Sequence, residues 1–249
     1  MTLNSLGLTM QNRKPYSKPN EDSFLKDDVH QIYVIADGVS RDFENGSYPS
    51  PSPSKEIADL FVRRAYEYLL QHRTSTHDLC TVIRNSFVYA NRFVDIANMN
   101  RPNYFRPGAV GIICIIASAY LYYGYIGDCE GFIYNDKVRH VFTKCQTELI
   151  NKHGSEFTKP EIRTNICNNP LHPYSYGVIN GSANAESFIR TGKTPFDDCR
   201  LVLCTDGAQE TLDRLTNDEL DCFTVEDFQN KLCLSASDDD KTIIIVRKV

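Results

Sequence analysis

The sequence lacks any apolar run typical of a membrane span. Its longest apolar stretch, from Val110 to Gly127, is broken by Ser118 and by glycines, and no N-terminal run resembles a signal peptide. This stretch is typical of two β-strands. We therefore expect a protein without a membrane partner.

Clustered metal-binding residues of the zinc type are also missing. The nine cysteines include no Cys-x-x-Cys pair, and the six histidines are dispersed along the chain. Several cysteines lie in apolar runs, and their odd number and scatter indicate reduced thiols in the cytoplasm. The 32 acidic and 27 basic residues leave a net charge of −5, which argues against a nucleic-acid partner.

Three catalytic signatures are absent. The segment Thr191–Thr194 reads TGKT, but the first glycine of a phosphate-binding loop would stand where the chain has Ser187. No cysteine is followed by arginine at the sixth position, and no Gly-x-Ser-x-Gly elbow occurs. These absences exclude a phosphate-binding loop, a cysteine-dependent phosphatase and a serine hydrolase of that type.

The apolar residues that are present predict a mixed fold. They recur at helical spacing from Ile57 to Leu69 and from Leu79 to Ala97, with Ser52 or Ser54 as the cap of the first helix. Two neighbouring helices followed by neighbouring strands predict an α+β fold. The expected strands are Gln31–Ala36, Gly111–Ala119, Tyr120–Ile126, Gly131–Tyr134, Val138–Phe142, a strand in the segment 200–207, and Thr242–Val246.

The length fits one domain over residues 1–249. The four strands between Gly111 and Phe142 predict one antiparallel meander, with Asn135-Asp136 as a turn. Short helices are expected around Glu210–Leu220 and Val225–Leu234. Residues 145–195 are polar and weakly periodic, which predicts a loop-rich excursion.

Acidic residues lie at the ends of the strongest expected strands. Asp37-Gly38 and Asp206-Gly207 each follow an apolar strand, and Asp128 follows the strand that ends at Ile126. A single Asp-Gly pair is typical of a hairpin turn, and aspartate also caps helices, so these remain alternatives for each position. Further acidic residues precede the first and last of these strands: Glu21, Asp22, Asp238, Asp239 and Asp240.

If the strands share one core, these carboxylates meet at one end of it. Two like charges about 4 Å apart cost on the order of 4 kcal/mol at an effective dielectric constant near 20. Several such pairs would exceed the stability of an ordinary domain. Divalent cations remove this objection, and hard ions such as Mg²⁺ and Mn²⁺ prefer oxygen ligands. No calcium-binding D-x-[DN]-x-[DN]-G loop is present.

Six short segments, taken in order, resemble the type 2C family of metal-dependent protein phosphatases. The resemblance runs from about residue 7 to the C-terminus. It implies two antiparallel sheets packed face to face between pairs of helices. It also implies a hydrolase that removes phosphate from phosphoserine and phosphothreonine proteins. The segments are PNEDSF, VIADGVS, PGAVG, YIGDCEGFIY, LVLCTDGAQE and DDDKTIIIV.

The resemblance further implies a site with two Mn²⁺ or Mg²⁺ ions. Asp37 would bridge the ions and the carbonyl of Gly38 would bind one of them, while Asp206 and Asp239 would be the other direct ligands. These three aspartates would be the catalytic carboxylates. A water that bridges the ions would attack phosphorus in line.

Three more acidic residues complete the implied site. Glu21 and Asp22 would bind through water or support the ligands, and Asp128 falls where many bacterial relatives hold a third, weaker metal. The choice of Asp239 over its neighbours rests on counting back from Thr242.

Two positions depart from the family pattern. Many relatives grip the phosphate with an arginine four residues before the Glu-Asp pair, where this chain has Ser17. Lys18 and Arg41 are the expected phosphate contacts instead. Some relatives carry a histidine after the first Asp-Gly, where this chain has Val39, so water or another group must protonate the leaving oxygen.

These departures leave two alternatives. One is a catalytically silent module that binds a kinase or another partner through residues 145–195. The other is a small-molecule phosphatase on the same scaffold. Under the main hypothesis the partners are a phosphorylated protein substrate and a cognate kinase.

Overall fold

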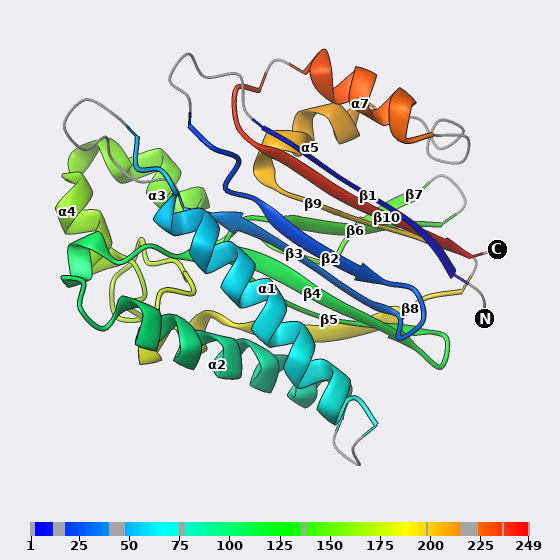
Figure 1. The fold of residues 1–249 in the computed structure, drawn as a ribbon, viewed down its shortest axis with the longest axis horizontal. Coiled ribbons are helices and arrows are strands. Elements are labelled where there is room, and N and C mark those ends of the chain that lie inside the picture. The colour runs from blue at the N-terminus through cyan, green and yellow to red at the C-terminus, as the bar shows by residue number, and fades with distance from the viewer. Residues whose placement is uncertain are drawn as a thin grey trace.

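Two five-stranded antiparallel sheets stack between two layers of helices in this computed structural model (Figure 1). The arrangement is the α+β sandwich that the sequence predicts. The structure describes residues 3–11, 18–39, 48–74, 78–135, 138–197, 199–214, 224–235 and 237–248.

The first sheet has the order β1-β10-β9-β6-β7, and the second has the order β2-β3-β4-β5-β8. The first comprises β1 (Leu3–Met10), β10 (Lys241–Lys248), β9 (Arg200–Cys204), β6 (Glu130–Asn135) and β7 (Val138–Val141). The second comprises β2 (Ser23–Asp27), β3 (Ile32–Gly38), β4 (Ala109–Ala117), β5 (Tyr120–Ile126) and β8 (Arg190–Pro195).

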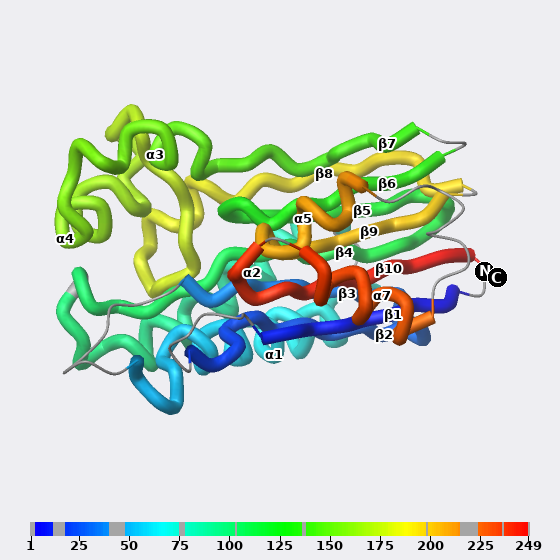
Figure 2. Tube along the Cα trace, turned by 90° about the horizontal axis from the view of Figure 1, so that it is seen from above, coloured from blue at the N-terminus to red at the C-terminus, as the bar shows by residue number. Residues whose placement is uncertain are grey.

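Long helices cover the second sheet and shorter ones cover the first. Helices α1 (Pro53–His72) and α2 (Leu79–Asn98) pack on the second sheet, and α5 (Asp206–Asp213) and α7 (Val225–Cys233) pack on the first (Figure 1). The small helices α3 (Glu148–His153) and α4 (Lys159–Glu161) lie beyond one end of the sheets (Figure 2). Both chain termini lie at the opposite end.

The buried apolar side chains form three layers: one between α1, α2 and the second sheet, one between the two sheets, and one between the first sheet and α5 and α7. Strand β3 contributes side chains to the first two of these layers. Successive side chains of a strand point to opposite faces. Ile32 and Val34 therefore face α1 and α2, while Tyr33 and Ile35 face the other sheet, and all four side chains are fully buried. Asp37 continues the face of Tyr33 and Ile35, so it is directed into the space between the sheets.

The start of α1 follows directly from its sequence. Ser52 is the N-cap, with a hydroxyl that accepts a hydrogen bond from the backbone N–H of Lys55. Pro53 occupies the first helical position, where no backbone N–H is needed, and Glu56 lies in the first turn, where negative charge is favoured. Of the two expected caps, Ser52 is therefore the one used.

The prediction of a single meander is wrong. Strands β4 and β5 pair with each other, as do β6 and β7, but β6 pairs on its other side with β9. The chain crosses between the sheets after Ile126. Gly127 has a φ of +88°, and a Cβ there would lie 2.3 Å from the side chain of Val110, so the crossing requires glycine. Asp136 of the expected turn lies outside the described residues.

Three strands escaped the sequence analysis. They are the edge strands β1, β2 and β8, which carry many polar residues. Strand β8 contains Thr191–Thr194, so the TGKT segment lies in a strand paired with β5. The stretch 145–195, which the sequence predicts to be loop-rich, therefore contains the regular elements α3, α4 and β8. Residues 215–220 of the helix expected around Glu210–Leu220 lie outside the described residues.

No helix in the described ranges is long and apolar enough to cross a membrane. Within the same ranges, none of the cysteines forms a disulfide bond.

Removal of the Ile244 side chain tests the layer between the sheets. This side chain on β10 is fully buried, so Ile244→Ala should lower the free energy of unfolding by about 2–5 kcal/mol. Ile96→Ala is the matched control, because Ile96 is 61% exposed on α2, and it should change that energy by less than about 0.5 kcal/mol. Urea unfolding measures both, and equal losses would contradict this arrangement of the core.

Candidate functional site

Acidic residues from five segments meet at the end of the two sheets that lies opposite the chain termini. The charges of Asp22, Asp206, Asp128 and Asp239 all act on Asp37. The sequence predicted that these strand ends would converge, and the structure places them together. The residues are Glu21, Asp22, Asp37, Asp128, Asp206, Asp239 and Asp240, which we call the acidic cluster.

The Asp-Gly pairs are not hairpin turns. Gly38 ends β3 and Gly207 lies in the first turn of α5, and neither has a positive φ. A Cβ on Gly38 would lie 2.7 Å from the carbonyl oxygen of Glu21, and one on Gly207 would lie 2.0 Å from that of Asp240. The glycines therefore allow the backbones of two other acidic segments to approach the strand ends.

Glu21 is buried and firmly held. Its Oε1 accepts hydrogen bonds from the hydroxyls of Tyr48, at 2.8 Å, and Ser52. Its backbone N–H donates to Oδ2 of Asp240 over 2.9 Å. Glu21 thus joins the start of α1 to the segment that precedes β10.

Asp22 is also buried, and Thr205 fixes it. The hydroxyl of Thr205 donates to Oδ2 of Asp22 over 2.8 Å and accepts the backbone N–H of Thr242 over 2.9 Å. Burial is the main cause that raises the pKa of Asp22 to about 8; the hydroxyls of Thr242 and Thr205 oppose the rise, and the charges of Asp240 and Asp206 add to it. Its Oδ1 is buried and accepts no hydrogen bond from the described residues.

Four of the remaining carboxylates lie nearer to solvent, whereas Asp240 is buried. Asp37 and Asp128 are partly exposed, Asp206 is exposed, and the side chain of Asp239 is 39% exposed. Oδ2 of Asp128 accepts a hydrogen bond from the hydroxyl of Thr147 over 2.9 Å. An ion that enters from solvent would meet these four groups before the buried Glu21, Asp22 and Asp240.

Desolvation raises the pKa values of three of these outer carboxylates, Asp206, Asp37 and Asp128. Desolvation, followed by the charges of Asp128 and Asp239, raises the pKa of Asp206 to about 6 although part of the residue reaches solvent. Desolvation also raises the pKa of Asp37, and here the charge of Asp22 is the next cause. The pKa of Asp128 is raised as well, mainly by desolvation. A nearby cation would favour the charged forms and reverse these shifts.

The donor chemistry of the acidic cluster fits a hard divalent cation. Its side chains offer carboxylate oxygens alone, which Mg²⁺ and Mn²⁺ prefer, and Oδ1 of Asp22 is a buried acceptor without a partner among the described residues. Within the described ranges, however, no three Asp, Glu, His or Cys side chains are placed to hold one ion as they stand. The acidic cluster therefore has the oxygen ligands that a divalent cation prefers, but its described side chains must move to coordinate one.

Lys18 lies inside the acidic cluster, with a side chain only 6% exposed. Its Nζ is 3.2 Å from Oε2 of Glu21, 3.3 Å from Oδ1 of Asp239 and 3.5 Å from Oδ2 of Asp240. These contacts were not foreseen, and the phosphate contact expected of Lys18 remains a prediction. Arg41, the other expected phosphate contact, lies outside the described residues.

Sequence reasoning missed the groups that hold the carboxylates in place. Among these groups, only Asp240 is marked by a sequence pattern, because it belongs to the acidic run Asp238–Asp240 before β10. The hydroxyl residues Thr205, Thr147, Tyr48 and Ser52 are common types, and only the folded arrangement directs them at carboxylates.

A recess of about 520 Å³ lies near the end of β5, with Tyr125 in its lining. Gln146 lines it, and Oε1 of Gln146 accepts the backbone N–H of Gly127 over 3.1 Å. Lys144 and Arg190 contribute positive charge to its lining, and Glu148 contributes negative charge. Most of its lining comes from residues 144–190, so this part of the chain forms a surface next to the acidic cluster.

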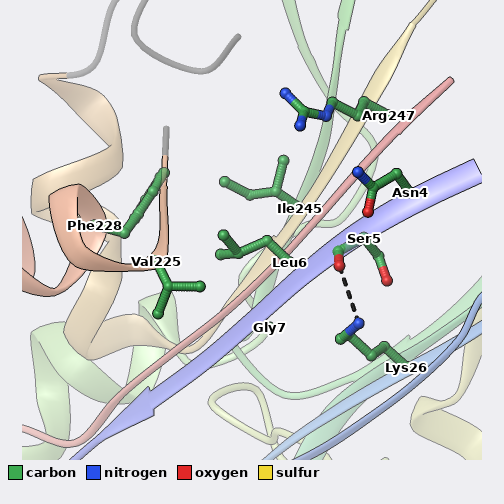
Figure 3. A pocket seen from close by; sticks show the side chains of 9 residues that line it. All are labelled: Asn4, Ser5, Leu6, Gly7, Lys26, Val225, Phe228, Ile245 and Arg247. Atoms are coloured by element: carbon green, nitrogen blue, oxygen red, sulfur yellow. Dashed lines mark hydrogen bonds between the residues drawn. The ribbon is translucent and has the colours of Figure 1, made fainter. Parts of the chain in front are cut away.

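A second recess, of about 250 Å³, lies away from the acidic cluster, between α7 and the paired strands β1 and β10 (Figure 3). Leu6, Phe228 and Ile245 line it together with Arg247, and no acidic residue does. It lies midway along β10, whereas Asp239 and Asp240 precede that strand. Among the described residues it therefore offers no carboxylate to a divalent cation.

No family model and no curated protein matches the chain in sequence. In three dimensions it is similar to bacterial serine/threonine phosphatases, and the three comparisons below each show 16% identity. The M. tuberculosis serine/threonine phosphatase PstP/Ppp gives a TM-score of 0.74 over 99% of both chains. The S. agalactiae serine/threonine phosphatase gives 0.72 over 99% of this chain and 100% of that one. The catalytic domain of PstP in complex with two manganese ions gives 0.70 over 98% and 97%.

Similarity at this level of identity establishes the fold. The chain has the fold of the metal-dependent, type 2C phosphatases, as its sequence motifs implied.

The close approach at Gly207 can be tested with one methyl group. Gly207→Ala places a Cβ against the Asp240 carbonyl oxygen, so it should reduce the free energy of unfolding by about 1–3 kcal/mol. Gly154→Ala is the control, because its Cβ would have no neighbour closer than 4.0 Å, and it should leave stability within about 0.5 kcal/mol. Thermal unfolding measures both. An unchanged Gly207→Ala protein would refute the close approach.

The raised pKa values predict how the metal-free protein responds to pH. Asp206 and Asp22 bind a proton more tightly when the protein is folded. The stability from Asp206 is therefore lost as pH rises through about 6, and that from Asp22 as pH rises through about 8. In chelator, the midpoint of urea unfolding should fall as pH rises from about 5 to about 8, and Asp22→Asn should flatten the decline. A urea midpoint that rises over this pH range would contradict the raised pKa values of Asp206 and Asp22.

Proposed function

We propose that the protein is a metal-dependent phosphomonoester hydrolase that removes phosphate from phosphoserine and phosphothreonine proteins. The observation that carries the proposal is the convergence of five acidic segments in a fold shared with serine/threonine phosphatases. Two bound Mn²⁺ or Mg²⁺ ions would activate a bridging water and offset the charge on the phosphoryl oxygens.

The side chains divide into ligands and supports. Asp37, Asp206 and Asp239 are the direct ligands in this proposal, because they are the residues that the sequence resemblance implies, and the charges of Asp206 and Asp239 act on Asp37. The carbonyl of Gly38 is a further ligand. Asp128 would hold a third, weaker ion.

Buried groups orient these ligands. Glu21 is fixed by Tyr48 and Ser52, and Asp22 by Thr205, so both carboxylates have little freedom to turn away. Their task is to support the ligands directly or through water. Val39 follows the first Asp-Gly and has no proton to give, so solvent or another group protonates the leaving oxygen.

A phosphoprotein is the proposed substrate because of the recess of about 520 Å³ lined by Gln146, which bonds the backbone next to Asp128. Lys144 and Arg190 outnumber Glu148 among the described residues that line it, so the recess suits a segment with negative charge. A cognate kinase would supply the phosphorylated substrate. We also propose a cytoplasmic location, where thiols such as those described here stay reduced.

One observation favours a second candidate, a catalytically silent interaction module. The ammonium group of Lys18 lies against Asp239, a proposed ligand, and a resident cation there opposes metal binding. A folded protein that turns over no phosphopeptide, whether or not Mn²⁺ is added, would favour the module.

Loss of single ligands tests the hydrolase. Mn²⁺ should support hydrolysis of an aryl phosphate and of phosphothreonine peptides, and Asp37→Asn and Asp206→Asn should each lower kcat by about 100-fold or more. Asp238→Asn is the matched control, because Asp238 is exposed and adjoins Asp239, and it should keep activity. Full activity in chelator, or in both ligand variants, would exclude the proposal.

A further inference from the structure

We propose that Lys18 is a built-in cation of the acidic cluster, which positions Asp239 and competes with a divalent ion for that carboxylate. The inference rests on the proposed function and its metal site. It concerns how the positive charge of Lys18 changes the affinity of that site for metal.

The ammonium group of Lys18 is surrounded by carboxylates. It lies 3.2 Å from Glu21, 3.3 Å from Asp239 and 3.5 Å from Asp240, and the first and last of these side chains are almost completely buried. The contact with Asp239 also has hydrogen-bond geometry. A buried ammonium group is tolerated only with such partners, because desolvation otherwise makes it very costly.

Lys18 also links distant parts of the chain. It joins the residues before β2 to those before β10, and its own carbonyl oxygen accepts a hydrogen bond from Nε2 of Gln11 over 2.5 Å. The same Oδ1 atom of Asp239 also accepts the backbone N–H of Asp240 over 3.0 Å. The ammonium group thus holds a proposed ligand at a defined place in the absence of metal.

Lys18 stays charged. Burial lowers its pKa, but the charges of Asp239, Asp240 and Glu21 raise it more, so the pKa lies above the ordinary value for lysine. The positive charge is therefore a constant feature of the acidic cluster and no switch of pH.

The position of the Lys18 ammonium group favours the stability of the metal-free protein and disfavours the binding of metal at Asp239. Without metal, the ammonium group offsets repulsion between three carboxylates and so stabilises the fold. A divalent ion that approaches Asp239 meets a positive charge already bonded to Oδ1. Metal affinity at Asp239 is therefore reduced, while an ion held mainly by Asp37 is affected less.

Lys18→Gln tests the competition through metal binding. In isothermal titration calorimetry with MnCl₂, the variant should bind the more weakly held ion about tenfold or more tightly than the wild type. Its melting temperature in chelator should be lower, because the carboxylates lose their counter-charge. A purely structural role would lower the melting temperature without increasing the affinity.

Two controls and a safeguard accompany the experiment. Lys18→Arg keeps the charge and should retain wild-type affinity within about twofold. Lys152→Gln removes an exposed lysine on α3 that is paired with Glu148 and not with the acidic cluster. It should change neither the Mn²⁺ affinity nor the melting temperature. If Lys18→Gln does not fold without metal, it is purified with Mn²⁺ and its affinity is measured by competition with a chelating dye.

The outcomes separate this inference from the proposed function. Wild-type or weaker Mn²⁺ affinity in Lys18→Gln, or no Mn²⁺ binding by either protein, would overturn it. Tighter Mn²⁺ binding by the variant, without phosphatase activity in either protein, would uphold the competition and overturn the proposed function.

Discussion

Repulsion between carboxylates is the constraint on which this structure depends. The fold directs acidic strand ends and loops to one place, where burial and neighbouring charge raise the pKa values of Asp22, Asp37 and Asp206. An ordinary domain has only about 5–15 kcal/mol of net stability to set against such costs. Divalent cations bound at the acidic cluster would offset this repulsion.

Small and neutral groups make the convergence possible. Gly38 and Gly207 let backbone carbonyls approach where a Cβ would collide. Thr205 then joins β9 and β10 to Asp22 through one hydroxyl. The structure therefore answers why buried strands end in Asp-Gly: aspartate supplies the charge, and glycine supplies the room for the next acidic segment.

Much of this could be predicted from sequence, and the misses have physical causes. The buried strands β3 and β4 and the helices α1 and α2 have strong periodicity, and the acidic residues at strand ends are visible as a pattern. The edge strands β1, β2 and β8 lack continuous apolar runs because part of each faces solvent. The crossing at Gly127 leaves no trace in the periodicity, and the contact between Lys18 and Asp239 joins positions 221 residues apart.

The most direct test of the convergence is anomalous diffraction from crystals grown with Mn²⁺. Manganese should give anomalous peaks at the strand ends, in contact with Asp37 and Asp206. Peaks elsewhere on the surface, or none, with these two side chains directed into bulk solvent, would contradict the assignment of the acidic cluster as a metal centre.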